Sequence, residues 1–324
     1  MKMVKTILFS LSLFFCSSSL MAMDHVTVLL DWFINPDHAP LIVAQQQGFF
    51  KKQGLHVDLI PPADPADPIK LVAAGQADIG VTYQPEFTMA VSQGLPLVRI
   101  GSLINHPLGC LLTLSSRHIS TLKDLKGKKI GFDTGNNNHL GLKTMLNHAG
   151  LQLTDVQLIN LHFDEVEGLL THQVDAVNGV MRNFEPIELE LAGQPGKTFY
   201  PEDYGVPIYD ELIYIVNKRR VNEAILKKFM IAMTQATDYL IHHPQSCWDS
   251  FSLQNPALNN ELNRRVWFAT MPYFAKQPAA LDVTRYENYT AYLKQTGTIS
   301  TMPALNEYAV DLFSSYAHHP RAPL

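Results

Sequence analysis

The chain has 324 residues, of which 46% are hydrophobic and 17% are charged, and its formal net charge is −5. This length suits two units of ordinary domain size. The mildly acidic balance argues against nucleic acid as a partner, because binding to phosphates requires a basic surface.

The first 22 residues have the pattern of a secretory signal peptide. A basic start precedes an apolar stretch over residues 6–20, and small residues then offer a cleavage position after Ala22. Cys16 follows the bulky Phe15, whereas lipid attachment normally requires a small residue there. We therefore expect a soluble protein of the periplasm, and no later stretch is apolar for long enough to span a bilayer.

The remaining chain alternates strand and helix patterns, which is typical of a layered α/β fold. In a first unit we predict helices over residues 66–74 and 86–93 and strands over 26–30, 55–60, 77–81, 97–104 and 111–114. In a second unit we predict helices over 139–149 and 165–172, and strands just after Gly127 and over 156–160, 176–180 and 211–216. Apolar residues at helical spacing then predict a long helix over 220–241, followed by further helices.

One short pattern occurs twice. Gln76-Ala77-Asp78 and Gln173-Val174-Asp175 each follow the end of a predicted helix and precede a predicted strand that contains a glycine. Two similar α/β units suggest two lobes that face each other, with a hinge that allows closure on a ligand. A generic helix-to-strand turn would produce the same pattern.

The most informative segment joins the first predicted strand to a helix that begins near Ala39. It carries five side chains suited to contacts, namely Asp31, Trp32, Asn35, Asp37 and His38. A strand-to-helix loop rich in aromatic and polar side chains is where an α/β protein holds a small ligand. Our candidates for ligand contacts here are Asp31, Trp32, Asn35 and His38. The alternative is an irregular surface loop that hides one tryptophan.

Four segments, in this order, resemble one known family: residues 30–40, 47–55, 75–81 and 124–131. They resemble the thiamine-pyrimidine-precursor binding proteins of bacterial ABC importers (ThiY-like), and equally their relatives, the yeast-type thiamine pyrimidine synthases. The resemblance implies an α/β, two-lobed periplasmic-binding-protein fold of type II. One lobe would comprise residues 23–112 and 209–324, the other 113–208, and the ligand would lie between them.

The resemblance also implies roles for the candidate residues. Trp32 offers a flat face for stacking on an aminopyrimidine ring, and Asp31 and Glu185 offer carboxylates to a ring amine. Asn183, which follows the predicted strand over 176–180, can both donate and accept hydrogen bonds. The alternatives are a core role for Trp32 and a surface or capping role for the acids.

Further candidates lie in other loops. Tyr83 and Gln84 follow a predicted strand, where Tyr83 would form a second aromatic wall opposite the tryptophan. Asn138 belongs to the run over 135–139, whose backbone N–H groups would hold an anion or a polar ligand end, or would simply cap a helix. Tyr209 precedes the strand that returns to the first lobe, which makes it a weaker candidate.

The synthases share the expected fold, so an enzyme is the main alternative. With residues 77–81 in register, the synthase lysine and histidine positions fall on Thr82 and Glu86. Thr82 lacks the amine that a Schiff base requires, and no cysteine-rich stretch is present near residues 207–211. We therefore expect a binding protein without a cofactor, whose partners are a heteroaromatic small molecule and an ABC permease of the inner membrane. A sulfonate or a flavin precursor is the alternative ligand.

The remaining chemistry-bearing residues predict no further site. The pairs His242-His243 and His318-His319 and the scattered histidines lack metal-ligand spacing, so we expect no metal. Cys110 and Cys247 sit in apolar or helical contexts, which favours two buried free thiols over a disulfide.

Overall fold

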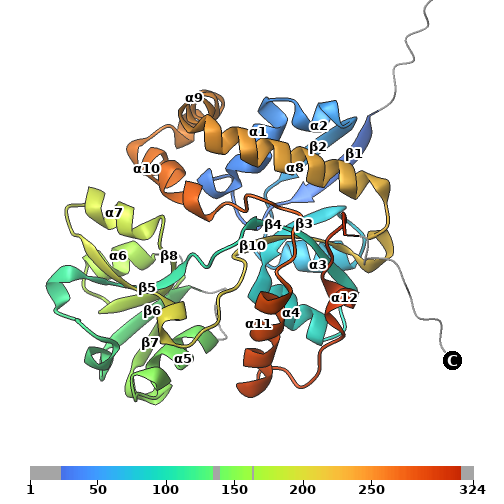
Figure 1. The fold of residues 1–324 in the computed structure, drawn as a ribbon. Coiled ribbons are helices and arrows are strands. Elements are labelled where there is room, and N and C mark those ends of the chain that lie inside the picture. Colours follow the sequence, from blue (N-terminus) through green and yellow to red (C-terminus); the bar gives the residue numbers. More distant parts are fainter. Residues whose placement is uncertain (1–22, 134–138, 163, 315–324) are drawn as a thin grey trace, which may run out of the picture.

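The computed structural model describes residues 23–133, 139–162 and 164–314, so the predicted signal peptide over residues 1–22 lies outside the described residues. The chain forms two α/β lobes, each built around a five-stranded sheet (Figure 1). The predicted two-lobed α/β fold is thereby confirmed. Within the described ranges, no helix is both long and apolar enough to cross a membrane.

The first sheet has the strand order β2-β1-β3-β10-β4. Its strands are β1 (Asp24–Leu29), β2 (Leu55–Ile60), β3 (Ile79–Tyr83), β4 (Leu97–Ile104) and β10 (Leu212–Asn217). β1 pairs in parallel with β2 and β3, whereas β10 lies antiparallel between β3 and β4. The loops that follow β1 and β3 therefore leave the sheet at the same edge.

The second sheet repeats this arrangement in the order β7-β6-β8-β5-β9. Its strands are β5 (Gly109–Leu114), β6 (Lys129–Asp133), β7 (Gln157–His162), β8 (Ala176–Met181) and β9 (Gly196–Phe199). β6 is parallel to β7 and β8, and β5 lies antiparallel between β8 and β9. Each sheet thus takes one antiparallel strand from a chain segment that arrives from the other lobe.

Two connections join the lobes. Residues 105–108 lead from β4 to β5, and residues 200–211 lead from β9 back to β10. The lobe boundary that the sequence places between residues 112 and 113 falls inside β5, a strand that belongs to the second sheet over its whole length.

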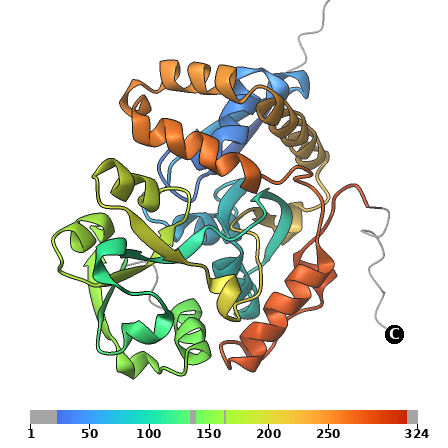
Figure 2. The same cartoon turned by 60° about the vertical axis from the view of Figure 1, so that its left-hand side comes forward.

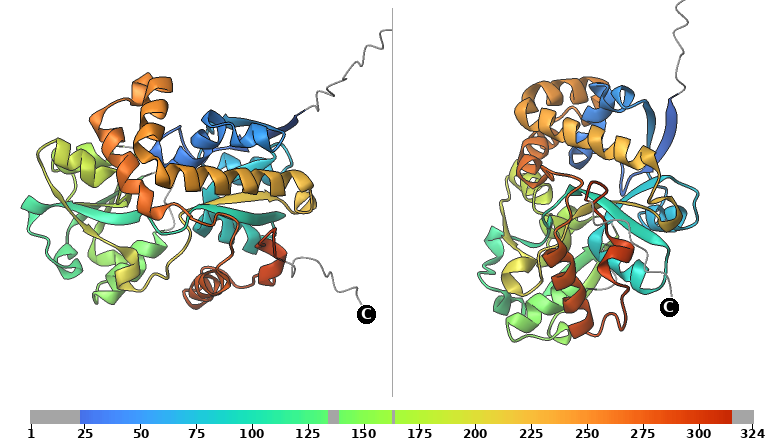
Figure 3. Two further views of the ribbon diagram at one scale, coloured as in Figure 1. Left: turned by 45° about the horizontal axis from the view of Figure 1, so that its top comes forward. Right: turned by 45° about the vertical axis from the view of Figure 1, so that its right-hand side comes forward.

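Helices pack against both sheets (Figure 3). With the first sheet belong α1 (Ala39–Gln46), α2 (Phe49–Lys52), α3 (Asp67–Ala73), α4 (Gln84–Ser92), α8 (Ala224–His242), α9 (Pro244–Gln254), α10 (Glu261–Thr270), α11 (Val283–Gln295) and α12 (Leu305–Tyr308). With the second sheet belong α5 (Leu140–His148), α6 (Glu165–Leu170) and α7 (Glu185–Leu191). The long α8 packs on α1 and α2, and α10 lies against α7 of the other lobe (Figure 2).

Each lobe has a hydrophobic core of its own. The largest core lies between the first sheet, α1 and α8, and includes Phe50 stacked on Phe229 with ring centroids 5.4 Å apart. Trp248 and Trp267 are also buried there, so Trp32 is the one tryptophan outside this core. Cys110 and Cys247 are free and buried, as the sequence predicts.

The repeated Gln-x-Asp pattern has the same structural role in both lobes. The Asp78 carboxylate accepts a hydrogen bond from the backbone N–H of Thr27 in β1, over 2.7 Å. The Asp175 carboxylate accepts one from the backbone N–H of Lys129 in β6, over 3.0 Å. Each aspartate therefore ties the start of one parallel strand to its neighbour, and the repeat reflects two matching α/β units.

Some predicted elements are wrong in extent or were missed. β3 continues to Tyr83 rather than ending at residue 81, because polar Thr82 is buried within the strand, with 2% exposed. α4 begins directly at Gln84, since Pro85 suits a first helical turn. The sequence predicts neither α7 nor β9, because both are short and the seven residues of α7 bury only Leu189.

Candidate functional site

The loop after β1 holds a buried carboxylate that two other side chains orient. Asp31 is 4% exposed and accepts a hydrogen bond from His38 Nε2 over 2.9 Å and another from the Tyr83 hydroxyl over 3.0 Å. Burial, followed by the negative charge of Asp31, raises the pKa of Tyr83 well above its usual value, so its hydroxyl keeps the proton that it donates. Three of the predicted site residues therefore form one cluster.

The local fold of this loop fixes the tautomer of His38. Asn35 caps the short 3₁₀ helix η1 (Pro36–His38), and its side-chain oxygen accepts from the backbone N–H of Asp37 over 2.8 Å. The backbone N–H of Asn35 in turn donates to His38 Nδ1 over 3.3 Å. With Nδ1 acting as acceptor, Nε2 carries the ring proton and donates it to Asp31. Asn35 thus shapes the loop.

Asp37 joins the two lobes. Its carboxylate accepts hydrogen bonds from Asn183 Nδ2, over 2.8 Å, and from the hydroxyl of Thr270 at the end of α10, over 2.9 Å. Asn183 Nδ2 also donates to the Thr270 hydroxyl over 2.7 Å. Burial raises the pKa of Asp37 even though these hydrogen bonds oppose the shift. The loop after β1 and the loop after β8 therefore meet at this contact.

Asn183 has an unused acceptor. It is 2% exposed, and its side-chain oxygen is buried without a hydrogen-bond partner among the described residues. Leaving such an atom unpaired costs about 1–3 kcal/mol, so it marks a position where a donor is expected. Gln84 is also fully buried, and its side-chain oxygen accepts a hydrogen bond from the backbone N–H of Asp210 over 2.7 Å. Its side-chain nitrogen has no hydrogen-bond partner among the described residues.

Glu185 begins α7, two residues after Asn183. Its carboxyl accepts a hydrogen bond from the backbone N–H of Met181 over 2.7 Å. Burial raises the pKa of Glu185 to about 8, and the backbone hydrogen bonds only partly oppose this. At neutral pH the group is therefore mainly a neutral carboxylic acid, which can donate as well as accept a hydrogen bond.

Glu211 ties the two interlobe connections together. It lies directly before β10, is 4% exposed, and accepts from the backbone N–H groups of Leu108 and, over 3.2 Å, Gly109. Burial raises its pKa to about 7. The sequence predicts Glu211 as part of a strand, and no local pattern distinguishes it as a candidate for the site.

Tyrosines line the other side of the junction between the lobes. Tyr209 lies 5.4 Å from Tyr289 of α11, measured between ring centroids. The next tyrosine on α11, Tyr292, hydrogen-bonds with Thr144 of α5 over 2.7 Å. α11 of the first lobe thereby contacts α5 of the second. Tyr209 belongs to this aromatic group rather than to the Asp31 cluster.

Of the two remaining candidates, Trp32 lies within the described residues and Asn138 does not. Trp32 is half-buried beside Asp31, and its ring meets that of Phe33 edge-on at 5.8 Å between centroids. The ring of Trp32 therefore contacts that of Phe33. Tyr83, which we expect as an aromatic wall opposite Trp32, donates its hydroxyl proton to Asp31. Asn138 lies outside the described residues.

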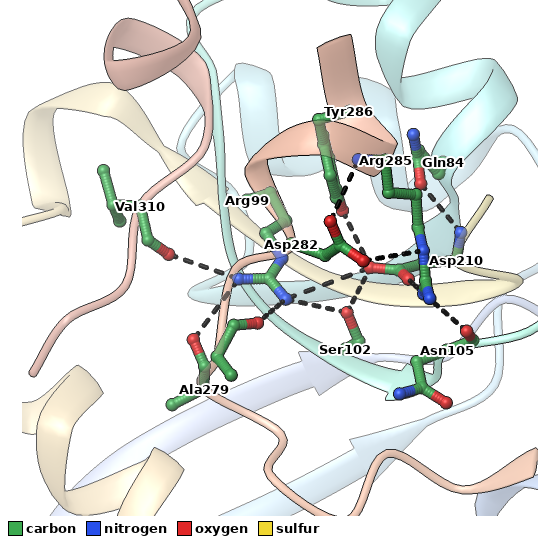
Figure 4. Close-up of polar contacts among 11 residues, drawn as sticks. Gln84, Arg99, Ser102, Asn105, Asp210, Ala279, Asp282, Arg285, Tyr286 and Val310 are labelled. Atoms are coloured by element: carbon green, nitrogen blue, oxygen red, sulfur yellow. Dashed lines mark hydrogen bonds and ion pairs between the residues drawn. The ribbon is translucent and has the colours of Figure 1, made fainter. Parts of the chain in front are cut away.

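A second polar cluster surrounds Asp210, next to Glu211 (Figure 4). Its carboxylate accepts hydrogen bonds from Ser102 and Arg285 and, over 3.1 Å, from the Tyr286 hydroxyl. The buried Arg99 donates to Ser102 Oγ over 2.8 Å and binds three carbonyl oxygens of the C-terminal segment. This cluster holds α11 and the C-terminal segment onto the first sheet, a structural role.

Arg182, the residue before Asn183, is already paired. Arg182 donates to both carboxylate oxygens of Glu202, over 2.6 and 2.9 Å, and its guanidinium lies 4.2 Å from the Tyr200 ring centroid. Arg182 is therefore engaged with Glu202 rather than with the acids at the junction, Asp31, Asp37, Glu185 and Glu211.

Comparison with known proteins places the chain among characterised families. The model of the family described as NMT1/THI5 like matches residues 35–247. A Haemophilus influenzae protein named as a thiamine biosynthesis protein is 46% identical over 90% of this chain and 93% of its own. The formylaminopyrimidine-binding protein of Halalkalibacterium halodurans is 35% identical over 69% of this chain and 68% of its own.

An enzyme is also among the relatives. The 4-amino-5-hydroxymethyl-2-methylpyrimidine phosphate synthase of Aspergillus parasiticus is 27% identical over 83% of this chain and 82% of its own. Among solved structures, the periplasmic aliphatic sulphonate binding protein of Escherichia coli superposes with a TM-score of 0.67 at 16% identity, over 88% of this chain and 96% of that one. This likeness shows the periplasmic-binding-protein fold.

Proposed function

Because this chain belongs to the NMT1/THI5-like family, we propose that it binds a pyrimidine precursor of thiamine, of the formylaminopyrimidine or hydroxymethylpyrimidine type. In this proposal it is the periplasmic substrate-binding component of an ABC importer, exported by a signal peptide over residues 1–22. The permease of the inner membrane supplies the energy for uptake. The named binding-protein relative and the fold both support this reading.

The observation that carries the proposal is the convergence of the loops after β1 and β8. Asp37 and Asn183 bond across the lobes, and Asn183 keeps a buried, unpaired oxygen. An exocyclic ring amine is a donor of the kind that this oxygen lacks. Trp32, in the same loop as Asp37, offers a face for the ring, and stacking adds about 0.5–1.5 kcal/mol beyond burial.

The carboxyl groups of Asp31 and Glu185 would then form hydrogen bonds with the polar edge of the ring. Asp31 is held by His38 and Tyr83, so its orientation is set before the ligand arrives. Glu185, with a pKa raised to about 8, is able to donate a proton in a hydrogen bond to a ring nitrogen. A carboxylate acceptor together with a carboxylic acid donor suits an aminopyrimidine, which presents both a donor and an acceptor.

Two observations favour a binding protein over a synthase. The position that aligns with the synthase lysine is Thr82, a buried residue of β3, and a hydroxyl cannot form a Schiff base. The position that aligns with the synthase histidine is Glu86, an exposed residue of α4. Neither side chain supplies the chemistry of the residue it replaces.

Mass spectrometry of small molecules released from the purified protein tests the proposal. We expect a formylated or free aminopyrimidine, and the same compound should raise the melting temperature when it is added back. A pyridoxal phosphate adduct would instead indicate a synthase. A sulfonate or a flavin precursor that stabilises the protein, with no response to pyrimidines, would assign the ligand to another class.

A further inference from the structure

The outer face of the first two strands carries a group of potential metal ligands far from the junction of the lobes. His25 lies on β1, and His56 and Asp58 lie on β2. One ligand atom from each residue lies within 4.8 Å of the other two. The sequence predicts no metal site here, because the two histidines are far apart along the chain.

Strand pairing explains how the three side chains meet. In the parallel register of β1 and β2, His25 is directly opposite His56. Side chains alternate between faces along a strand, so Asp58, two residues after His56, lies on the same face. The intervening Val26 and Val57 point the other way and are buried in the core. The ligands are thus displayed on a rigid, paired backbone.

The two imidazoles already converge on the same carboxylate. His25 Nε2 lies 2.9 Å from one oxygen of Asp58, and His56 Nε2 lies 3.3 Å from the other. The rings themselves are 5.2 Å apart between centroids. Two ligands on one zinc ion are roughly 3–3.5 Å apart, given metal–ligand bonds of about 2.0–2.2 Å. Small rotations of exposed side chains would therefore bring all three atoms onto one ion.

We propose that His25, His56 and Asp58 form a binding site for a divalent transition-metal ion, with Zn²⁺ as the representative case. Imidazole nitrogens with one carboxylate suit zinc, nickel and copper, whereas magnesium and calcium prefer oxygen ligands alone. Because the side chains are about half exposed, water completes the coordination. The ion would join β2, the edge strand of the sheet, to β1.

The test is a calorimetric titration of untagged, metal-free protein with Zn²⁺, with Mg²⁺ as the comparison ion. We expect one Zn²⁺ per chain, no response to Mg²⁺, and a higher melting temperature with Zn²⁺ because only the folded state assembles the site. H56A and D58N should each weaken Zn²⁺ binding by at least about tenfold. Removing a residue that only hydrogen-bonds to a metal ligand already weakens metal binding by about that factor, and here a ligand itself is lost.

H242A is the matched control, since it removes another exposed histidine near a carboxylate, that of Asp238, at the end of α8. It should leave Zn²⁺ binding unchanged. The variants at exposed positions should melt like the wild type in metal-free buffer, which separates ligand loss from misfolding. Absence of a bound Zn²⁺ in the wild type, or equal binding by H56A and wild type, would overturn the proposal. Pyrimidine binding is measured separately, so the two proposals fail independently.

Discussion

Trp32 is the residue on which the proposed ligand contacts depend most. It is the tryptophan outside the hydrophobic core, and it adjoins the oriented carboxylate of Asp31. We predict that W32A weakens binding of an aminopyrimidine by tenfold or more, about 1.4 kcal/mol, because stacking and ring burial are both lost. Isothermal titration of the two proteins with the same compound measures the difference.

F33A is the matched control for this substitution. Phe33 neighbours Trp32 and touches its ring edge-on, but its side chain is 67% exposed. We expect F33A to change the affinity by less than W32A does. Equal losses in both variants would mean that the loop is merely disturbed, and unchanged binding by W32A would place the ligand elsewhere.

The raised pKa values of two glutamates predict a pH dependence of stability. Folding raises the pKa of Glu185 to about 8 and that of Glu211 to about 7, so the folded state holds protons that the unfolded state releases above about pH 4.5. Stability from these groups is present below pH 4.5 and is lost as the pH rises through 7 and 8. The melting temperature of the ligand-free wild type should therefore fall between pH 6 and pH 9.

E185Q and E211Q test that sign directly. Glutamine keeps an acceptor oxygen but cannot ionise. The melting temperature of each variant should therefore fall less between pH 6 and pH 9 than that of the wild type. E167Q, at an exposed position of α6, is the control and should follow the wild type. A wild-type profile retained by both E185Q and E211Q would show that these carboxyls do not set the dependence.

At the residue level, the sequence indicates contacts between residues that are close along the chain, but not contacts between residues that are far apart along it. Asp31 and His38 lie seven residues apart in one loop, so a single motif pointed to both. Thr270 joins Asp37 across 233 residues, and nothing in its helical surroundings sets it apart before α10 has docked. Glu211 was missed for the same reason, because its partners are backbone N–H groups of the other interlobe connection.

The matched turns before β3 and β8 give a prediction at the scale of single elements. Asp78 and Asp175 each bind the backbone N–H of the neighbouring parallel strand. We expect D78A and D175A each to lower the free energy of unfolding by about 1–2 kcal/mol, since each loses this charged hydrogen bond together with an ion pair, to Arg220 for Asp78 and to Arg117 for Asp175. Urea denaturation followed by circular dichroism measures this.

D203A serves as the control, because Asp203 is an exposed acid in a short 3₁₀ helix of the second interlobe connection. Its midpoint of denaturation should match the wild type. If D78A and D175A also matched the wild type, the repeated pattern would be a sequence coincidence without energetic consequence.

Elements differed in how well their sequences predicted them. β2, in which Leu55 and Val57 alternate with polar residues, and β4, which is buried throughout, agree with the predicted bounds of 55–60 and 97–104. β9 has one buried residue among four and gave no pattern to recognise. The pairing of β10 between β3 and β4 could not be predicted, because strand order depends on contacts between distant segments.

At the scale of the whole molecule, side chains of the two lobes contact each other directly. Asn183 of the second lobe bonds to Asp37 of the first, and Arg265 of α10 pairs with Glu190 of α7. We predict that N183D opens the molecule, because a carboxylate would face the carboxylate of Asp37. Small-angle X-ray scattering of ligand-free protein should give a larger radius of gyration for N183D than for the wild type.

R265A is the control, because it removes an exposed contact between the lobes whereas N183D changes a partly buried one. The Arg265–Glu190 pair lies at the surface, where an ion pair contributes little to stability, so R265A should scatter like the wild type. A larger radius of gyration for R265A than for N183D would assign closure to the surface pair and contradict the role given to Asn183.

Calorimetric titration of ligand-free protein with formylaminopyrimidine shows whether the chain binds a pyrimidine precursor of thiamine. We predict saturable binding of one molecule per chain, with no comparable heat from pyridoxal phosphate or an alkanesulfonate. Absence of pyrimidine binding, together with saturable binding of either anion, would contradict this prediction.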